Sequence, residues 1–178
     1  MKITGGFLKN YKLLAPKGIK TRPTSEKLRQ VVFNICQHQI HTAHFLDLFA
    51  GSGAMGIEAL SRGACSATFI EKDRCALRAL RQNVYNLNIC HLVTILTGDV
   101  LIHLTRLKGK SFDLIYLDPP YEQDLYKKPL QLIDHFKMVS EGGLLFLEGR
   151  SLEDFPLANL KLKKRKTGST SLYQFIPI

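Results

Sequence analysis

Short apolar runs alternate regularly with segments of helical periodicity, and this alternation constrains the fold more than any other feature of the chain. The runs of strand length are 44–49, 67–71, 92–96, 112–118 and 144–148. The helix candidates between them are 54–62, 73–87, 100–107 and 125–139. A repeated strand-helix unit packs into a parallel sheet covered by helices on both faces. The sequence therefore predicts a doubly wound α/β fold with central parallel strands.

The two ends of the chain show a different pattern. Strand candidates 2–4 and 11–14 flank a Gly5, Gly6 turn, which predicts a small N-terminal β-hairpin. A helix capped by Thr24 or Ser25 follows, with an apolar face of Leu28, Val31, Val32 and Ile35. Segments 160–164 and 171–176 predict a C-terminal antiparallel strand pair. We expect one domain over residues 1–178, in which residues 1–20 form the hairpin extension.

The net charge of +10 is concentrated at the two ends of the chain. Residues 1–30 contain eight Lys or Arg and one acid, and residues 158–178 contain five and no acid. Residues 31–157 contain 12 bases and 14 acids, so the middle has a net charge of −2. Two basic ends around a near-neutral body are typical of a protein that binds a polyanion, although solvated tails give the same pattern.

Cysteine and histidine positions do not indicate a metal site. The four cysteines, Cys36, Cys65, Cys75 and Cys90, form no C-x-x-C pair, so we expect free thiols in a reducing compartment. Three histidines recur at every third residue from 38 to 44, but no carboxylate or thiol pattern accompanies them. No apolar run approaches the roughly 18 residues of a spanning helix, and residues 1–12 lack an apolar signal core. We expect a cytoplasmic protein without a metal or a membrane segment.

A glycine-rich turn follows the first central strand. Gly51, Gly53 and Gly56 match G-x-G-x-x-G directly after Asp47 to Ala50. Such a turn lets a ligand pass close to the backbone, but NAD enzymes, other nucleotide-binding proteins and methyltransferases all contain it.

Acidic residues also follow the next two strands. Glu71 lies 20 residues after Gly51, where a carboxylate can accept the hydroxyls of an adenosine ribose. Gly98 and Asp99 follow the third strand, so Asp99 can accept a hydrogen bond from an adenine amino group. The alternatives are a strand-end charge for Glu71 and a helix cap for Asp99.

The run Asp118, Pro119, Pro120, Tyr121 ends a central strand and indicates methylation of an amino group on a planar ring. Such a nitrogen is a poor nucleophile because its lone pair is delocalised. The Asp118 carboxylate and the Pro119 carbonyl can each accept one of its hydrogens, which directs the lone pair toward a methyl sulfonium. Tyr121 can stack on the ring, and the prolines stiffen the turn. A purely structural turn is the alternative.

Five motifs together carry a resemblance to a known family: 3–6, 22–24, 47–53, 58–64 and 118–121. The chain resembles the small bacterial methyltransferases that modify guanine N2 in 16S ribosomal RNA. The resemblance implies a Rossmann-like class I methyltransferase sheet and S-adenosylmethionine as cofactor. It also implies these cofactor contacts: Asp47, Ala50, Gly51 and Gly53 on the methionine part, Arg22, Pro23 and Thr24 closing over it, and Glu71 and Asp99 on ribose and adenine. Asp118 to Tyr121 would be catalytic.

The resemblance further implies that the N-terminal hairpin helps to hold RNA. The basic residues that we expect to contact RNA are Lys9, Lys12, Lys161, Lys163, Lys164 and Arg165. The expected partner is 16S ribosomal RNA, either free or within an assembling small subunit, and the protein is expected to be a monomer. The target guanine must lie in a loop or be flipped out, because its amino edge cannot otherwise reach Asp118.

Other functions remain open at the level of the residues. An adenine-N6 methyltransferase of DNA or RNA would use the same Asp-Pro-Pro-Tyr run, and a protein-glutamine methyltransferase uses a related turn that usually opens with Asn. A non-catalytic RNA-binding assembly factor would need the basic ends alone. A dinucleotide oxidoreductase explains the glycines but leaves Asp118 to Tyr121 without a role.

Overall fold

The computed structural model describes residues 1–16, 25–120, 125–149, 152, 155–166 and 171–178. Its helices are α1 Glu26–Ile35, α2 Ala54–Ser61, α3 Arg74–Asn86, α4 Val100–Arg106 and α5 Lys127–His135, with a single 3₁₀ turn at Cys90–Leu92. Its strands are β1 His44–Leu48, β2 Ser66–Glu71, β3 Val93–Thr97, β4 Phe112–Leu117, β5 Val139–Gly149, β6 Leu160–Lys166 and β7 Ser171–Pro177. Strands and helices alternate from β1 to β5, as predicted.

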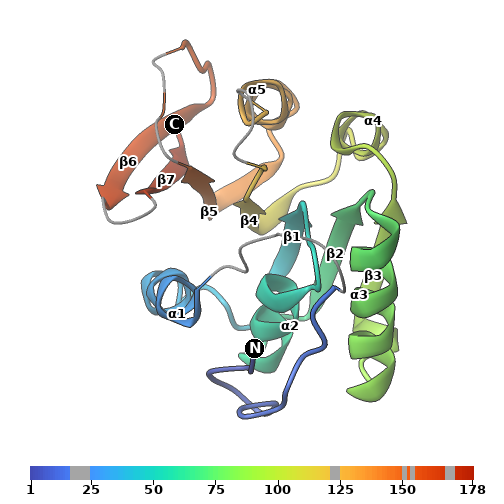
Figure 1. Cartoon of the computed structure of the whole chain (residues 1–178). Coiled ribbons are helices and arrows are strands. Elements are labelled where there is room, and N and C mark those ends of the chain that lie inside the picture. The colour runs from blue at the N-terminus through green and yellow to red at the C-terminus, as the bar shows by residue number, and fades with distance from the viewer. Residues whose placement is uncertain (17–24, 121–124, 150–151, 153–154, 167–170) are drawn as a thin grey trace.

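The described strands form one sheet in the order β3-β2-β1-β4-β5-β7-β6 (Figure 1). Strands β1 to β5 are parallel, and β7 is antiparallel to both β5 and β6. The predicted doubly wound sheet and its C-terminal antiparallel pair are therefore confirmed. Because β1, β2 and β4 are parallel, their carboxyl ends meet at one edge of the sheet, where the strand order changes direction between β1 and β4.

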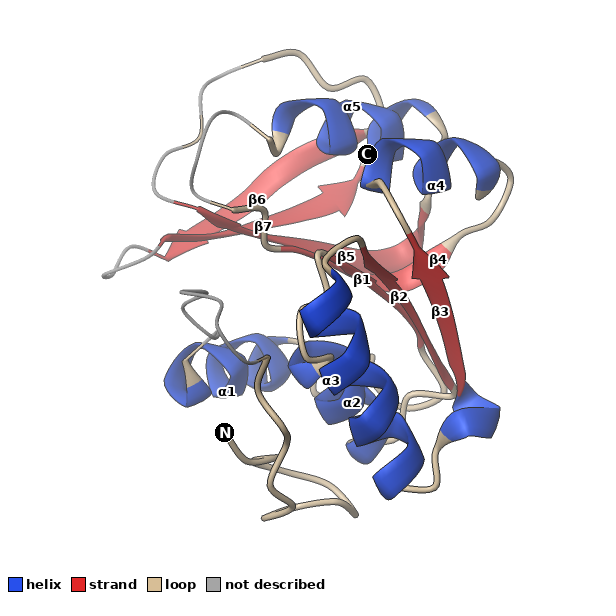
Figure 2. Cartoon of the chain, turned by 45° about the vertical axis from the view of Figure 1, so that its right-hand side comes forward, coloured by secondary structure: helices blue, strands red, loops and turns tan. Residues whose placement is uncertain are grey.

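Helices cover both faces of the sheet in three layers (Figure 2). The α1, α2 and α3 helices lie on one face, where Phe45, Phe69 and Tyr116 are buried in a shared core. The α4 and α5 helices lie on the other face over a second core, which includes Leu46, Ile115 and Leu145. Central strands buried on both faces explain why their sequences are almost continuously apolar. Within the described residues no helix has the length and hydropathy needed to cross a membrane.

The prediction was wrong at the junction of α5 and β5. The helix ends at His135 instead of running to Val139, because Lys137 adopts a left-handed backbone with φ of 51° and turns the chain into the strand. The strand then begins at Val139 rather than Leu144. Its pairing with β4 skips from Val139 to Leu144, so residues around Gly142 bulge out of the ladder.

The predicted N-terminal hairpin is only partly formed. Lys2 and Lys12 make an isolated antiparallel bridge, and strands 2–4 and 11–14 are not formed. The two arms still exchange backbone hydrogen bonds, such as Ile3 N to the Tyr11 carbonyl at 3.0 Å and Asn10 N to the Ile3 carbonyl at 2.9 Å. The turn between them bonds to α2: the N–H of Phe7 donates to the Ser61 carbonyl at 2.8 Å, and the N–H of Leu8 donates to Ser61 Oγ at 2.9 Å. A side chain at Gly6 would collide with the Ser61 carbonyl, so glycine is required for this close approach.

A buried ionic cluster fastens the same N-terminal segment to α1 and α2. Glu58 accepts hydrogen bonds from the N–H and the hydroxyl of Thr4 at 2.8 and 2.7 Å. Its carboxylate also lies 2.8 Å from Arg62 Nε and 3.4 Å from Arg29 Nε. Burial lowers the pKa of Arg29, and the Glu58 charge opposes this shift. The motifs 3–6 and 58–64 are thus two halves of one contact.

The α1 helix buries more than its predicted apolar face. Ser25 caps it by accepting a hydrogen bond from Leu28 N at 3.1 Å, as one of the two predicted caps. Arg29, Val32 and Phe33 are its fully buried residues, whereas Leu28 and Ile35 are half-buried. The buried face is rotated toward Arg29 because its guanidinium donates to the Lys2 carbonyl and forms an ion pair with Glu58.

Candidate active site

The predicted site residues that the structure describes gather at the carboxyl edge of the parallel strands. Asp47 and Ala50 belong to β1 and its turn, Glu71 ends β2, and Asp118 follows β4. Register places Asp47 beside Phe69 of β2 and Tyr116 of β4, so the three strand ends lie at similar heights. This edge is the usual ligand position in open α/β sheets.

Asp47 is a buried carboxyl group beneath the glycine turn. It is 2% exposed, and its Oδ2 accepts a hydrogen bond from Gly56 N at 3.1 Å. Burial raises the pKa of Asp47 from 3.8 to about 7, the Gly56 N–H lowers it, and the charge of Glu71 raises it further. A cation that comes close to this carboxyl group favours its charged form.

The glycines of the turn have different physical roles. Gly51 has φ of 57°, and a Cβ placed on it would meet no atom within 4 Å, so the space above it is open for a ligand. Gly53 also has positive φ, but its Cβ would lie 2.3 Å from Leu80 Cδ1 of α3. Gly51 therefore leaves room for the predicted cofactor, whereas Gly53 is favoured by its left-handed backbone at the start of α2, and its contact with the cofactor stays a prediction. Ala50 is buried, and its N–H donates to the Ile70 carbonyl at 3.0 Å.

Glu71 closes the glycine turn onto β2. Its Oε2 accepts from Gly51 N at 2.7 Å, and its Oε1 accepts from the N–H groups of Lys72 and Asp73, both at 2.8 Å. A carboxylate has about four lone-pair positions, so roughly one remains for a ligand hydroxyl. Gly98 lies next to it, since the Gly98 N–H donates to the Glu71 carbonyl at 2.9 Å.

Asp99 caps α4 in the structure. Its Oδ1 accepts from Leu101 N at 2.8 Å, which is the helix-cap alternative weighed from the sequence. The side chain is exposed at the same edge, and its other oxygen can accept a second hydrogen bond. Contact with an adenine amino group stays a prediction.

The acceptor motif follows β4, the neighbour of β1. Asp118 is half-buried, Pro119 is buried and Pro120 is exposed. Two residues before Asp118, the Tyr116 hydroxyl donates to Glu148 Oε2 on β5, and both side chains are buried. This cross-strand bond holds the ends of β4 and β5 together beneath Asp118. Tyr121 lies outside the described residues.

Arg22, Pro23 and Thr24 also lie outside the described residues, but the segment that leads to them is tied to the glycine turn. Asn83 of α3 accepts from Leu14 N at 2.8 Å and donates to the carbonyls of Leu14 and Ser52 at 3.1 and 3.0 Å. Sequence reasoning missed Asn83. Its signal was a polar residue next to Leu80 and Val84 on the apolar face of α3.

The basic residues predicted to contact RNA occupy two separate regions. Lys9 and Lys12 are exposed on the N-terminal segment, which packs at the Ser61 end of α2 and lies away from the strand arrowheads in Figure 1. Lys161, Lys163 and Lys164 are exposed on β6, at one end of the sheet order. A bulge between Leu162 and Lys164 disturbs the alternation of this strand, so the neighbouring residues Lys163 and Lys164 both face solvent together with Lys161. The side chain of Arg165 lies outside the described residues.

The histidines 38, 41 and 44 do not converge. His44 Nδ1 lies 2.8 Å from Ser66 Oγ, and His38 contacts Gln37. Across the part of the chain that the structure describes, no three His, Cys, Asp or Glu side chains form a group that could hold a metal ion.

Comparison with known proteins connects this geometry to a family. Residues 1–176 match the family described as conserved hypothetical protein 95. The chain is 32% identical over 176 residues to the ribosomal RNA small subunit methyltransferase D of Buchnera aphidicola, covering 98% of this chain and 92% of that one. Against the Escherichia coli K12 protein of the same name it is 31% identical, covering 98% and 88%.

Solved structures agree with the sequence relatives. The putative methyltransferase yhhF from Escherichia coli matches with a TM-score of 0.87 at 31% identity, over 99% of this chain and 97% of that one. The putative RNA methyltransferase PH1948 from Pyrococcus horikoshii matches with a TM-score of 0.73 at 16% identity, over 94% of this chain and 93% of that one. At this identity the match supports the fold alone. The chain therefore has the Rossmann-like class I methyltransferase fold and belongs to the family described as conserved hypothetical protein 95.

Proposed function

We propose that this protein is an S-adenosylmethionine-dependent methyltransferase that methylates the exocyclic N2 of a guanine in 16S ribosomal RNA. The observation that carries the proposal is the position of the acceptor motif. Asp118 and Pro119 follow β4, and β4 pairs directly with β1, which ends in the open glycine turn. A base held by the motif and a methyl donor held by the turn would lie side by side.

The residues at the glycine turn fit the proposed cofactor. The open space at Gly51 admits a ligand close to the backbone, and the buried Asp47 carboxyl group beneath the turn suits an amino-acid ammonium group. Glu71 has a lone-pair position left for a ribose hydroxyl. Bound S-adenosylmethionine supplies an already activated methyl group on a sulfonium, so the protein's contribution is binding and orientation.

The acceptor residues orient the nucleophile. The Asp118 carboxylate and the Pro119 carbonyl accept the two hydrogens of the exocyclic amino group, which turns the nitrogen lone pair toward the methyl group. The Tyr116–Glu148 bond beneath fixes the end of β4 on which Asp118 stands. Asp118 can then accept the proton that the methylated nitrogen releases.

Ribosomal RNA as substrate is supported by the relatives and by the charge distribution. The similar proteins from Buchnera aphidicola and Escherichia coli are named ribosomal RNA small subunit methyltransferase D. The exposed lysines of β6 would contact phosphates next to the target, and a flipped guanine would enter the site.

An activity assay with Asp118 variants tests the proposal. Purified protein, labelled S-adenosylmethionine and 16S RNA, supplied free or as small subunits, should yield N2-methylguanosine. Asp118→Ala should lower kcat about 100-fold or more, because orientation of the amino group is lost, while the Kd for S-adenosylmethionine changes little. Asp113→Asn, on the same strand but at its other end, is the matched control and should retain activity.

The product identifies the alternative if the proposal is wrong. Incorporation into adenine as N6-methyladenosine would point to the adenine-N6 enzyme. Tight RNA binding without any methyl transfer would point to an assembly factor. Near-normal activity of Asp118→Ala would remove the proposed chemistry itself.

A further inference from the structure

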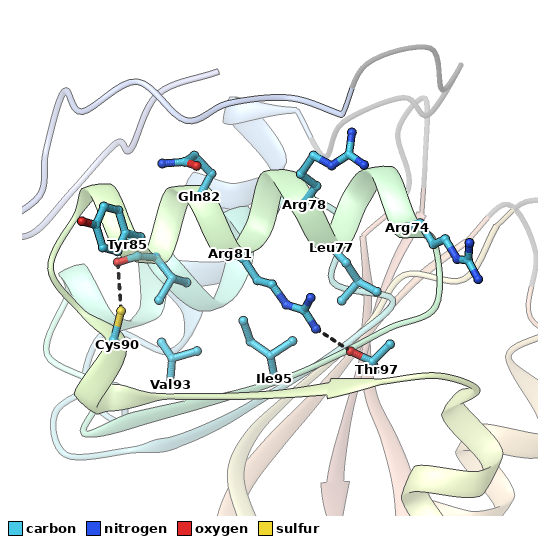
Figure 3. A pocket seen from close by; sticks show the side chains of 11 residues that line it. Arg74, Leu77, Arg78, Arg81, Gln82, Tyr85, Cys90, Val93, Ile95 and Thr97 are labelled. Carbon is cyan, nitrogen blue, oxygen red and sulfur yellow. Dashed lines mark hydrogen bonds between the residues drawn. The ribbon is translucent and has the colours of Figure 1, made fainter.

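A groove of about 890 Å³ runs between α3 and β3, and none of the residues that line it was assigned a role above. Its floor includes Leu77 of α3 and Ile95 of β3, and three arginines line it: Arg74, Arg78 and Arg81. Figure 3 shows Leu77 and Arg81 pointing from α3 toward β3, where Arg81 donates to Thr97 Oγ1 at 3.1 Å. Arg78 points away from the strand along the other rim.

The charged residues of this groove are all basic. Residues 74–97 contain three arginines and one histidine but no Asp or Glu, although residues 31–157 as a whole have more acids than bases. All three arginines are exposed. Guanidinium groups bind phosphate oxygens through two parallel N–H bonds, so this lining is complementary to a polyanion.

The position of the groove connects it to the active site. Arg74 begins α3 three residues after Glu71, and Thr97 ends β3 directly before Gly98. One end of the groove therefore opens beside the proposed cofactor edge. From there α3 extends for 13 residues, or about 20 Å, to Tyr85 and Cys90 at the other end.

An exposed aromatic side chain stands at the far end of the groove. Tyr85 is 71% exposed, so its ring is accessible to a ligand. Proteins that bind single-stranded nucleic acid combine a basic groove along the backbone with aromatic rings on which bases stack. The arginines and Tyr85 give the α3–β3 groove both parts.

We propose that the α3–β3 groove binds a single-stranded segment of the substrate RNA next to the target nucleotide. This inference rests on the proposed function, because it takes RNA as the substrate. Strand β3 and strand β6 are at opposite ends of the sheet order, so the RNA would be held at both edges with the reacting base between them. The charge count along the sequence did not indicate the α3 surface.

Binding of a 16S RNA transcript, followed by fluorescence anisotropy at 0.05 to 0.2 M salt, tests the groove. The triple variant R74Q/R78Q/R81Q should bind at least ten-fold more weakly at 0.15 M salt. The slope of log affinity against log salt should fall by about 2, at roughly 0.7 per lost single-strand phosphate contact. The kcat at saturating RNA and the Kd for S-adenosylmethionine should stay unchanged.

The matched control removes the same charge elsewhere. The triple R106Q/K108Q/K110Q lies at the end of α4 and beyond it, on the other face of the sheet, and all three side chains are exposed. It should keep the wild-type salt slope. The double variant R74Q/R78Q leaves the Arg81–Thr97 bond intact and guards against a folding defect, which a melting curve also detects.

Tyr85 supplies an independent readout. Tyr85→Ala should weaken RNA binding about ten-fold, whereas Tyr85→Phe, which keeps the stacking ring, should restore it. Equal RNA affinities of the groove triple and the control triple would overturn the groove proposal, and would leave an acidic protein partner as the occupant to test. Absence of methyl transfer by the wild-type protein would instead reject the proposed function, whatever the variants bind.

Discussion

At the scale of single residues, Asp47 links the structure to a measurable pH dependence. Burial raises the pKa of this carboxyl group to about 7, well above its ordinary value of 3.8. At pH values between 3.8 and about 7, Asp47 holds a proton in the folded protein that it has released in the unfolded chain. The free energy of unfolding therefore falls as pH rises through this window, and the loss is complete above about pH 7.

When the proposed cofactor binds, its ammonium group should cause Asp47 to release the proton that it holds in the free protein. Because a nearby cation favours the carboxylate, the affinity for S-adenosylmethionine should rise several-fold from pH 6.0 to 7.5, a range below the ordinary pKa of an α-amino group. Isothermal titration calorimetry should show proton release on binding. Asp47→Asn should bind more weakly and lose the pH dependence; an unaltered pH dependence in this variant would place the titrating group elsewhere.

At the scale of elements, the Glu58 cluster fastens the N-terminal segment to α1 and α2. Glu58 is fully buried between two arginines and Thr4. Removal of one partner from a buried ion pair leaves an uncompensated charge, which typically costs about 3 to 5 kcal/mol.

Glu58→Gln should therefore lower the free energy of unfolding by about 3 kcal/mol, measured by urea denaturation. The variant keeps the side-chain volume and removes the charge. Glu26→Gln is the control, because Glu26 is exposed and its loss should change stability by less than about 1 kcal/mol. Similar losses in both variants would show that the buried cluster does not anchor the segment.

Asn83 connects the same segment to the glycine turn. Asn83→Ala would leave the Ser52 and Leu14 carbonyls without their donor, so the turn should be held less firmly. We expect the Kd for S-adenosylmethionine to rise several-fold while kcat at saturating cofactor stays near wild type. Asn86→Ala, one turn along the same helix and exposed, should change neither value. A fall in kcat alone would contradict this positioning role.

The sequence predicted the central strands and the helices between them because their apolar patterns and motifs lie within short stretches of the chain. The strands before Gly51 and Asp118 are apolar on both faces, and the motifs that follow them are continuous in sequence. The N-terminal segment differs, since its backbone partner Ser61 is more than 50 residues away. The burial of Arg29 likewise depends on Glu58, and the early end of α5 depends on one left-handed residue, Lys137. Periodicity carries no information on such contacts.

At the scale of the whole molecule, the basic surfaces flank the site instead of forming one continuous patch. The β6 lysines lie at one end of the sheet, and the arginines of the α3–β3 groove lie at the other. The net charge counted over residues 31–157 did not indicate the second surface, because acids elsewhere in that range outnumber the bases.

Replacement of the β6 lysines should affect RNA and not the cofactor. The triple K161Q/K163Q/K164Q should raise the KM for 16S RNA severalfold, more so at higher salt, because phosphate contacts are lost. Steady-state kinetics at fixed saturating S-adenosylmethionine measures this effect, and the Kd for the cofactor should be unchanged. If the KM equals that of R106Q/K108Q/K110Q, the β6 lysines are a solvated strand face.

The proposed methylation of guanine N2 in 16S ribosomal RNA can be tested in cells. Mass spectrometry of nucleosides from 16S RNA, isolated from cells with and without this protein, tests it most directly. The amount of N2-methylguanosine should decrease when the protein is absent, and it should return with the wild-type chain but not with Asp118→Ala. An unchanged amount of N2-methylguanosine in cells that lack the protein would contradict the proposed function.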